Sequence, residues 1–160
     1  MNIQDPQFIQ FLQRAKSSTY AASENAPQLF TASSRAQSHD LAYSEGDWSY
    51  YDTYLGGLSF IGEEAVWHCG QPLWGMNYYG AMIPNGQVDT PPDGFSAFLK
   101  LALRNPPAEA PYRGPACLEQ GAYVYECRWQ GDLAEFWGDE TIALDGRLIY
   151  RLRFHGGLVR

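Results

Sequence analysis

Basic side chains are scarce in this chain of 160 residues. Lysine occurs only at Lys16 and Lys100, and 11 basic residues stand against 18 acidic ones, for a formal net charge of -7. Affinity for a phosphate backbone needs clustered Lys and Arg side chains. The balance therefore disfavours a nucleic acid or an anionic membrane surface as the partner.

Cysteine is also rare, and long apolar runs are missing. Cys69, Cys117 and Cys127 are odd in number and lack the spacing of a metal-binding motif, so the sequence predicts neither a disulfide framework nor a metal site. No nucleophile elbow or phosphate loop is present, and we expect no cofactor. No apolar run could span a bilayer and no signal segment is visible, so we expect a cytoplasmic protein.

Aromatic residues, by contrast, make up 15% of the chain, and together with glycine they recur in two similar stretches. Residues 46–80 match residues 121–156 at a shift of 75 that becomes 76 after one inserted residue, which aligns Glu64 with Glu140. An internal repeat of this kind predicts two related halves. Chance matching in a chain rich in glycine and aromatics is the alternative.

Each stretch follows a predicted helix. Asp5 and Pro6 are typical of a helix start, and Asp93 could cap a second helix. Strands are predicted near residues 48–55, 63–69, 73–82, 122–130, 139–145 and 147–155. The predicted fold class is α+β: a single domain over residues 1–160, internally duplicated, with two helix-plus-antiparallel-sheet halves (about 5–83 and 93–160) related by a pseudo-twofold axis.

Alternation along the predicted strands indicates which side chains face inward. In the second half one face is apolar, whereas the aligned face of the first half carries Asp52 where the second has Cys127, and His68 where it has Leu144. Isolated charges on an apolar face are costly unless they are paired or hydrated. The pattern therefore predicts either a satisfied buried network or the lining of a pocket.

We favour a pocket, because aromatic walls around a few polar groups are typical of small-molecule sites. The predicted ligand-binding residues are Trp48, Tyr50, Asp52, Tyr54, Glu64, His68, Trp74 and Tyr78. Two carboxylates among aromatic rings favour a cationic or amine-bearing, partly apolar ligand. We expect Asp52 to be the partner of His68 across neighbouring strands.

Two other functions stay open. Asp52 or Glu64 could work with His68 as the general acid and base of a small enzyme. Alternatively, the acidic surface could meet a basic protein partner, as an immunity-type inhibitor does. Weaker site candidates are the pair His39-Asp40 and the segment Tyr112-Arg113-Gly114, which could supply a cation to a cleft or serve only as a turn.

The motifs SHDLAYSEGD, DTYLGG, FIGEEAVW, MNYYG, PYRGP and FHGG together resemble an uncharacterised bacterial domain family. The resemblance covers roughly residues 8–157. Members of that family occur alone or behind a helix-turn-helix module of the kind found in phage-repressor-like regulators. The resemblance implies a free-standing or regulator-associated sensor domain, and it brings no catalytic residues with it.

Overall fold

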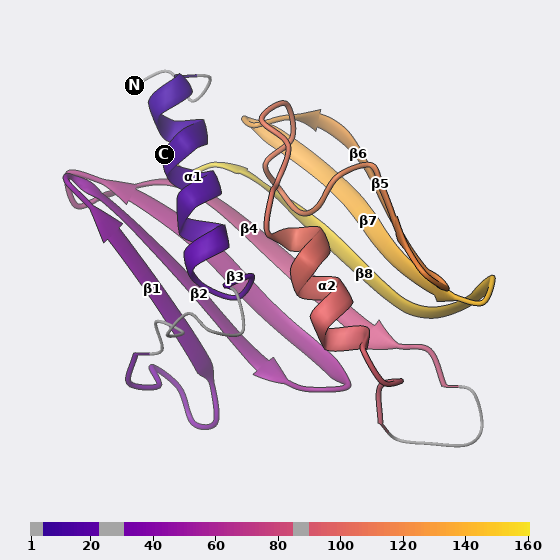
Figure 1. The fold of residues 1–160 in the computed structure, drawn as a ribbon. Coiled ribbons are helices and arrows are strands. Elements are labelled where there is room, and N and C mark those ends of the chain that lie inside the picture. The colour runs from indigo at the N-terminus through magenta and orange to yellow at the C-terminus, as the bar shows by residue number, and fades with distance from the viewer. Residues whose placement is uncertain (1–4, 23–30, 85–89) are drawn as a thin grey trace.

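The computed structural model describes residues 5–22, 31–84 and 90–160 and shows one antiparallel sheet of eight strands with two helices on one face (Figure 1). The strands lie in the order β1-β2-β3-β4-β8-β7-β6-β5. The elements are α1 (Pro6–Ser18), β1 (His39–Glu45), β2 (Trp48–Gly56), β3 (Ser59–His68), β4 (Gln71–Met82), α2 (Phe95–Leu103), β5 (Cys117–Gln120), β6 (Tyr123–Asp132), β7 (Glu135–Leu144) and β8 (Arg147–Leu158).

The predicted fold class is wrong. The chain does not form two helix-plus-sheet halves but one continuous, β-rich sheet, because β4 and β8 pair from Trp74 opposite Leu158 to Met82 opposite Tyr150. Two separate sheets would leave the edges of β4 and β8 with unpaired N–H and C=O groups, and this pairing satisfies them. Strand order runs from β1 to β4 and back from β8 to β5, but descent from a duplicated unit stays a prediction.

The two helices differ in how they begin. α1 starts as the sequence predicts, with Pro6 in the first turn and the Asp5 carboxylate accepting a hydrogen bond from the backbone N–H of Gln7 at 2.9 Å. The predicted cap of α2 at Asp93 is wrong. Gly94, with a φ of 82°, is the residue before that helix, a backbone conformation that glycine adopts without steric cost.

All six predicted strands are present, and two more flank them. β1 and β5 are the outermost strands of the sheet. The predicted loop over residues 21–37 lies partly outside the described residues; in the described part, residues 31–38 contain no helix or strand. Among the described residues neither helix has the length and apolar character needed to cross a membrane.

The core lies between the helices and the inner face of the sheet. α1 contributes four fully buried apolar side chains: Phe8, Phe11, Leu12 and Ala15. Beside them Trp74 of β4 stacks on Phe136 of β7 at 5.6 Å between ring centroids, and Phe136 stacks on Tyr112 at 3.9 Å. Tyr112 lies in the proline-rich connection after α2, so this contact fixes the position of the next residue, Arg113.

Candidate functional site

In the part of the chain that the structure describes, five charged side chains are buried between the helices and the inner face of the sheet, each at most 8% exposed. They come from α1, β2, β3, the connection after α2, and β7: Lys16, Asp52, Glu64, Arg113 and Glu140. Buried ions are stable only when they are paired and hydrogen-bonded. The contacts of each one therefore determine what the site can do.

Glu140 has a complete set of partners. Arg113 donates to both of its carboxylate oxygens, from Nε at 3.0 Å and from Nη2 at 2.7 Å. The hydroxyls of Tyr125 and Tyr150 donate to the same oxygens at 2.7 and 2.9 Å. Burial alone would raise the pKa of Glu140, but the charge and hydrogen bonds of Arg113 outweigh it and lower this pKa. Glu140 is an ionised structural anchor.

Glu64 is held by two cations. Lys16 Nζ contacts Glu64 Oε2 and also donates to the backbone carbonyl of Tyr112 at 2.8 Å. Arg113 Nη1 lies 3.8 Å from Glu64 Oε1, so this guanidinium bridges Glu64 and Glu140. Burial lowers the pKa of Lys16, and the charge of Glu64 opposes that effect.

Asp52 is the third carboxylate, and among the residues that the structure describes no cation forms an ion pair with it. It lies directly opposite Glu64 in the β2–β3 register and accepts a hydrogen bond from the Tyr78 hydroxyl at 2.7 Å. Burial, and then the charge of Glu64, raise the pKa of Asp52 to about 7, although Tyr78, Lys16 and Arg113 oppose this rise. With Asp52 ionised, three carboxylates face two cations.

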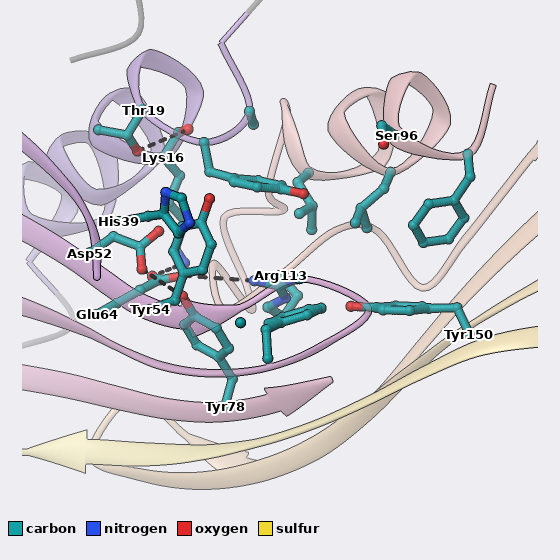
Figure 2. A pocket seen from close by; sticks show the side chains of 18 of the residues that line it. Lys16, Thr19, His39, Asp52, Tyr54, Glu64, Tyr78, Ser96, Arg113 and Tyr150 are labelled. Atoms are coloured by element: carbon teal, nitrogen blue, oxygen red, sulfur yellow. Dashed lines mark hydrogen bonds and ion pairs between the residues drawn. The ribbon is translucent and has the colours of Figure 1, made fainter. Parts of the chain in front are cut away.

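A cavity of about 250 Å³ lies over these groups, between the sheet and both helices (Figure 2). Lys16, Asp52, Glu64 and Arg113 line it, whereas Glu140 does not. Its aromatic lining residues are Tyr20, His39, Tyr50, Tyr54, Phe60, Tyr78, Phe95, Tyr112 and Tyr150. The cavity thus combines aromatic walls with charged groups at its floor, and these groups belong to a buried cluster that, with Glu140, holds three carboxylates and two cations.

The structure brings five of the predicted binding residues to this cavity: Tyr50, Asp52, Tyr54, Glu64 and Tyr78. It places Trp48, His68 and Trp74 elsewhere. Trp74 is fully buried in the core, and the His68 ring packs against Trp48 with 4.3 Å between centroids. The expected pairing of His68 with Asp52 is wrong, because the register of the β2–β3 hairpin sets His68 opposite Trp48 and Asp52 opposite Glu64.

Of the weaker candidates His39 and Asp40, the first lines the cavity and the second does not. His39 lines the cavity and stacks on Tyr54 at 4.8 Å between ring centroids. Asp40 faces the other side of the sheet, where Tyr51 and Thr53 donate hydrogen bonds to it at 2.5 and 2.7 Å. Burial would raise the pKa of Asp40, but these bonds and those of Ser34 together lower it. Asp40 therefore belongs to a separate structural network.

Sequence reasoning missed Lys16 and gave Arg113 too little weight. A signal for Lys16 exists, since it lies four residues after Leu12 and eight after Phe8, on the apolar stripe of α1. A lysine on the buried stripe of a helix needs a carboxylate partner, and the inward-facing Glu64 is one. No local signal finds Arg113, because its position depends on the path of an irregular connection.

Comparison with known proteins gives one family. A family model described as "Domain of unknown function (DUF5680)" matches residues 52–159. No curated protein matches the chain, and no solved structure does. The match includes Asp52, Glu64, Arg113 and Glu140, whereas α1 with Lys16 lies before it. Because the matched residues are more than half of the sequence, the chain belongs to this family of domains of unknown function.

Proposed function

We propose that the cavity binds a small molecule whose cationic or amine group pairs with Asp52 and whose apolar part contacts the aromatic walls. The observation that carries this proposal is the buried carboxylate of Asp52, held at a pKa of about 7 in the floor of an aromatic-walled cavity. A buried carboxylate without a cation of its own is costly, and a ligand cation would remove that cost.

The size of the cavity limits the ligand. Pockets for drug-sized molecules enclose roughly 300–1,000 Å³. The cavity here, at about 250 Å³, suits a molecule smaller than those. Tyr54 and His39 form one stacked wall, and Tyr150 lies on the far side of Arg113 (Figure 2). A flat or short aliphatic body with one amine group matches this arrangement.

The first experiment asks what the protein carries. The protein is purified from its own host and examined by native mass spectrometry in a volatile buffer. We expect a bound small molecule with wild type and with Asp139→Asn, which changes an exposed carboxylate, but not with Asp52→Asn. A retained protein instead would support the protein-binding alternative.

The second experiment does not depend on a retained ligand. Benzylamine and its neutral analogue benzyl alcohol are titrated into the protein and binding is followed by calorimetry. We expect benzylamine to bind more tightly, with an affinity that rises with pH through about 7, because the cation favours the ionised form of Asp52. Equal affinities for the two compounds, with no dependence on pH, would falsify the role of Asp52.

One observation favours a second function. A carboxyl group with a pKa near 7 can act as a general acid or base at neutral pH. Asp52 has such a pKa, although the structure does not bring His68 to it. Incubating the retained molecule with wild type and with Asp52→Asn distinguishes the two functions: only an enzyme converts it, and only wild type would do so.

A binding cavity also suits the sensor role that the sequence resemblance implies. In a chain that carries a helix-turn-helix module, ligand occupancy of this domain could be transmitted to the module. A domain that stands alone would report through a partner protein. We propose the sensor role only as an extension of ligand binding, and its test is whether a regulator and the small molecule are retained together in the native mass spectrum.

A further inference from the structure

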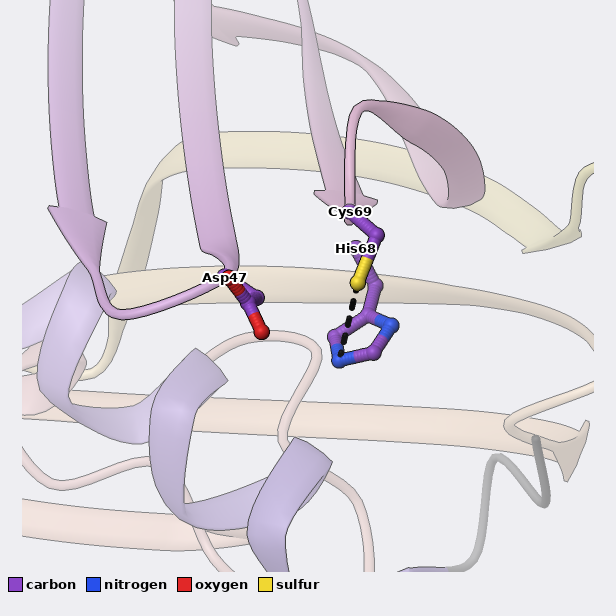
Figure 3. A group of neighbouring side chains, drawn as sticks. All are labelled: Asp47, His68 and Cys69. Atoms are coloured by element: carbon purple, nitrogen blue, oxygen red, sulfur yellow. Dashed lines mark hydrogen bonds between the residues drawn. The ribbon is translucent and has the colours of Figure 1, made fainter.

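Three potential metal ligands meet where two neighbouring hairpin turns come together (Figure 3). Asp47 lies in the turn between β1 and β2, His68 ends β3, and Cys69 begins the turn into β4. A carboxylate oxygen, an imidazole nitrogen and the Cys69 sulfur all lie within 4.8 Å of one another. None of the three residues lines the cavity. We propose that Asp47, His68 and Cys69 bind a divalent transition-metal ion, for which zinc is the best match.

The donor types point to this class of ion. Thiolate and imidazole select zinc and its neighbours, whereas calcium and magnesium need oxygen ligands. Zinc is commonly held by Cys, His and Asp side chains, and three protein ligands leave a fourth position for water or another molecule. Asp47 and Cys69 are exposed and His68 is half-buried, so an ion can reach all three donors from solvent.

The geometry needs little adjustment. Bond lengths of about 2.0–2.3 Å around tetrahedral zinc set neighbouring donor atoms about 3.3–3.6 Å apart. The distance from Cys69 Sγ to His68 Nε2 is 4.0 Å, and all three donor atoms lie within 4.8 Å of one another, so side-chain rotations that bring them about 0.5–1.5 Å closer complete the site. The backbone already holds the two turns together, because the N–H of Cys69 donates to the carbonyl oxygen of Asp47 at 2.9 Å.

The surroundings orient the ligands and provide a reporter. The Trp48 ring packs against the His68 ring and also stacks on Phe11 of α1, at 5.4 Å between ring centroids. A bound ion would therefore join the β1–β2 and β3–β4 turns beside α1 and add to the stability of the folded state. The spacing of the cysteines along the chain gives no hint of this site, because two separate turns form it.

The test is a titration of reduced, metal-free protein with Co²⁺, which takes zinc sites and is coloured. We expect one ion per chain, a thiolate-to-cobalt charge-transfer band, the visible bands of tetrahedral Co²⁺, and loss of all of these when Zn²⁺ is added. Quenching of tryptophan fluorescence should accompany binding and should be much smaller in Trp48→Phe.

Variants identify the ligands. Cys69→Ser should abolish the charge-transfer band, and Asp47→Asn and His68→Gln should each weaken binding by on the order of tenfold or more, since even outer-shell changes cost roughly tenfold. Cys117→Ser, which changes the other exposed cysteine, is the matched control and should leave the spectrum unchanged.

Circular dichroism of each metal-free variant establishes that it is folded before the titration. A charge-transfer band that survives in Cys69→Ser, or that disappears in Cys117→Ser, would overturn the proposal. The absence of any cobalt band with wild-type protein would overturn it as well. Asp52→Asn should bind Co²⁺ as wild type does, so the cavity and the metal site are tested independently.

Discussion

Two buried carboxylates occupy comparable places in the sheet but have very different partners. Glu140 on β7 lies opposite Cys127 of β6, and Glu64 on β3 lies opposite Asp52 of β2. Around Glu140 the neighbours supply a guanidinium and two hydroxyls, and the opposite residue adds no charge. Around Glu64 the opposite residue is another carboxylate, and the available cations cannot neutralise both.

Because of this difference, we interpret Glu140 as a structural anchor and Asp52 as part of a binding site. The Glu140 carboxylate is fully hydrogen-bonded and does not itself line the cavity, so it fixes Arg113 and the proline-rich connection. The Asp52 site borders the cavity and carries the surplus charge. Perturbed carboxylates in a cleft are typical of functional positions, whereas saturated ion pairs are typical of structure. Substitutions at the two sites should therefore have effects of different size and different dependence on pH.

The largest effect is expected from Glu140→Gln. The change keeps the shape of the side chain but leaves the buried Arg113 with only Glu64, at 3.8 Å, as an ionised partner, which should lower the free energy of unfolding by about 3–5 kcal/mol. Urea denaturation measures the loss. Glu135→Gln, an exposed position on the same strand, should stay within about 0.5 kcal/mol of wild type. A similar small effect at Glu140 would remove the basis for calling it an anchor.

Lys16→Met should come next, at about 2–4 kcal/mol, because Arg113 at 3.8 Å remains as a partial partner for Glu64. Without the lysine, Asp52 and Glu64 repel each other more strongly, so the loss should be greater at pH 8 than at pH 5.5. Thermal melts at the two pH values measure it, with Lys100→Met, a change of the other lysine, as the control. A loss independent of pH would contradict the coupling between Lys16 and the two carboxylates.

Asp52→Asn should stabilise the ligand-free protein at pH 8. The folded-state pKa of about 7 lies above the ordinary value for aspartate, so the folded state binds the extra proton and stability falls as pH rises from about 4 to 7. Asparagine does not titrate, so the variant does not lose this stability as the pH rises. We expect a gain of about 1–2 kcal/mol at pH 8, or roughly 3–8 °C in melting temperature, and a much smaller gain at pH 5. A loss of stability at both pH values would show that ionised Asp52 is already satisfied.

Tyr78→Phe should have the smallest effect. It removes the hydroxyl that donates to Asp52 and introduces phenylalanine, the residue found at position 154, where Phe154 is buried in the core. The loss of one hydrogen bond to a carboxyl should cost about 0.5–1.5 kcal/mol and raise the pKa of Asp52 further. Urea denaturation and a pH titration measure the two effects. An unchanged pKa would mean that the hydrogen bond from Tyr78 does not favour the ionised form of Asp52.

Local patterns predicted much of the structure. The first helix, the strand positions and the inward faces of Asp52 and Glu64 follow from capping, alternation and turns, which depend on near neighbours. The joining of β4 to β8 could not be predicted, because nothing local distinguishes an edge strand from a paired one. The position of Arg113 and the cluster of Asp47 with Cys69 could not be predicted for the same reason, because both depend on contacts between segments that are distant in the sequence.

The most direct test of the account is a titration of Asp52 by NMR, following its carboxyl carbon in ligand-free protein from pH 3 to pH 9. We predict a midpoint near pH 7, because burial and then the charge of Glu64 favour the protonated form of Asp52, and a lower midpoint when a ligand amine occupies the cavity. A midpoint at or below about 4, the ordinary value for aspartate, would contradict it, since Asp52 would then need no further cation.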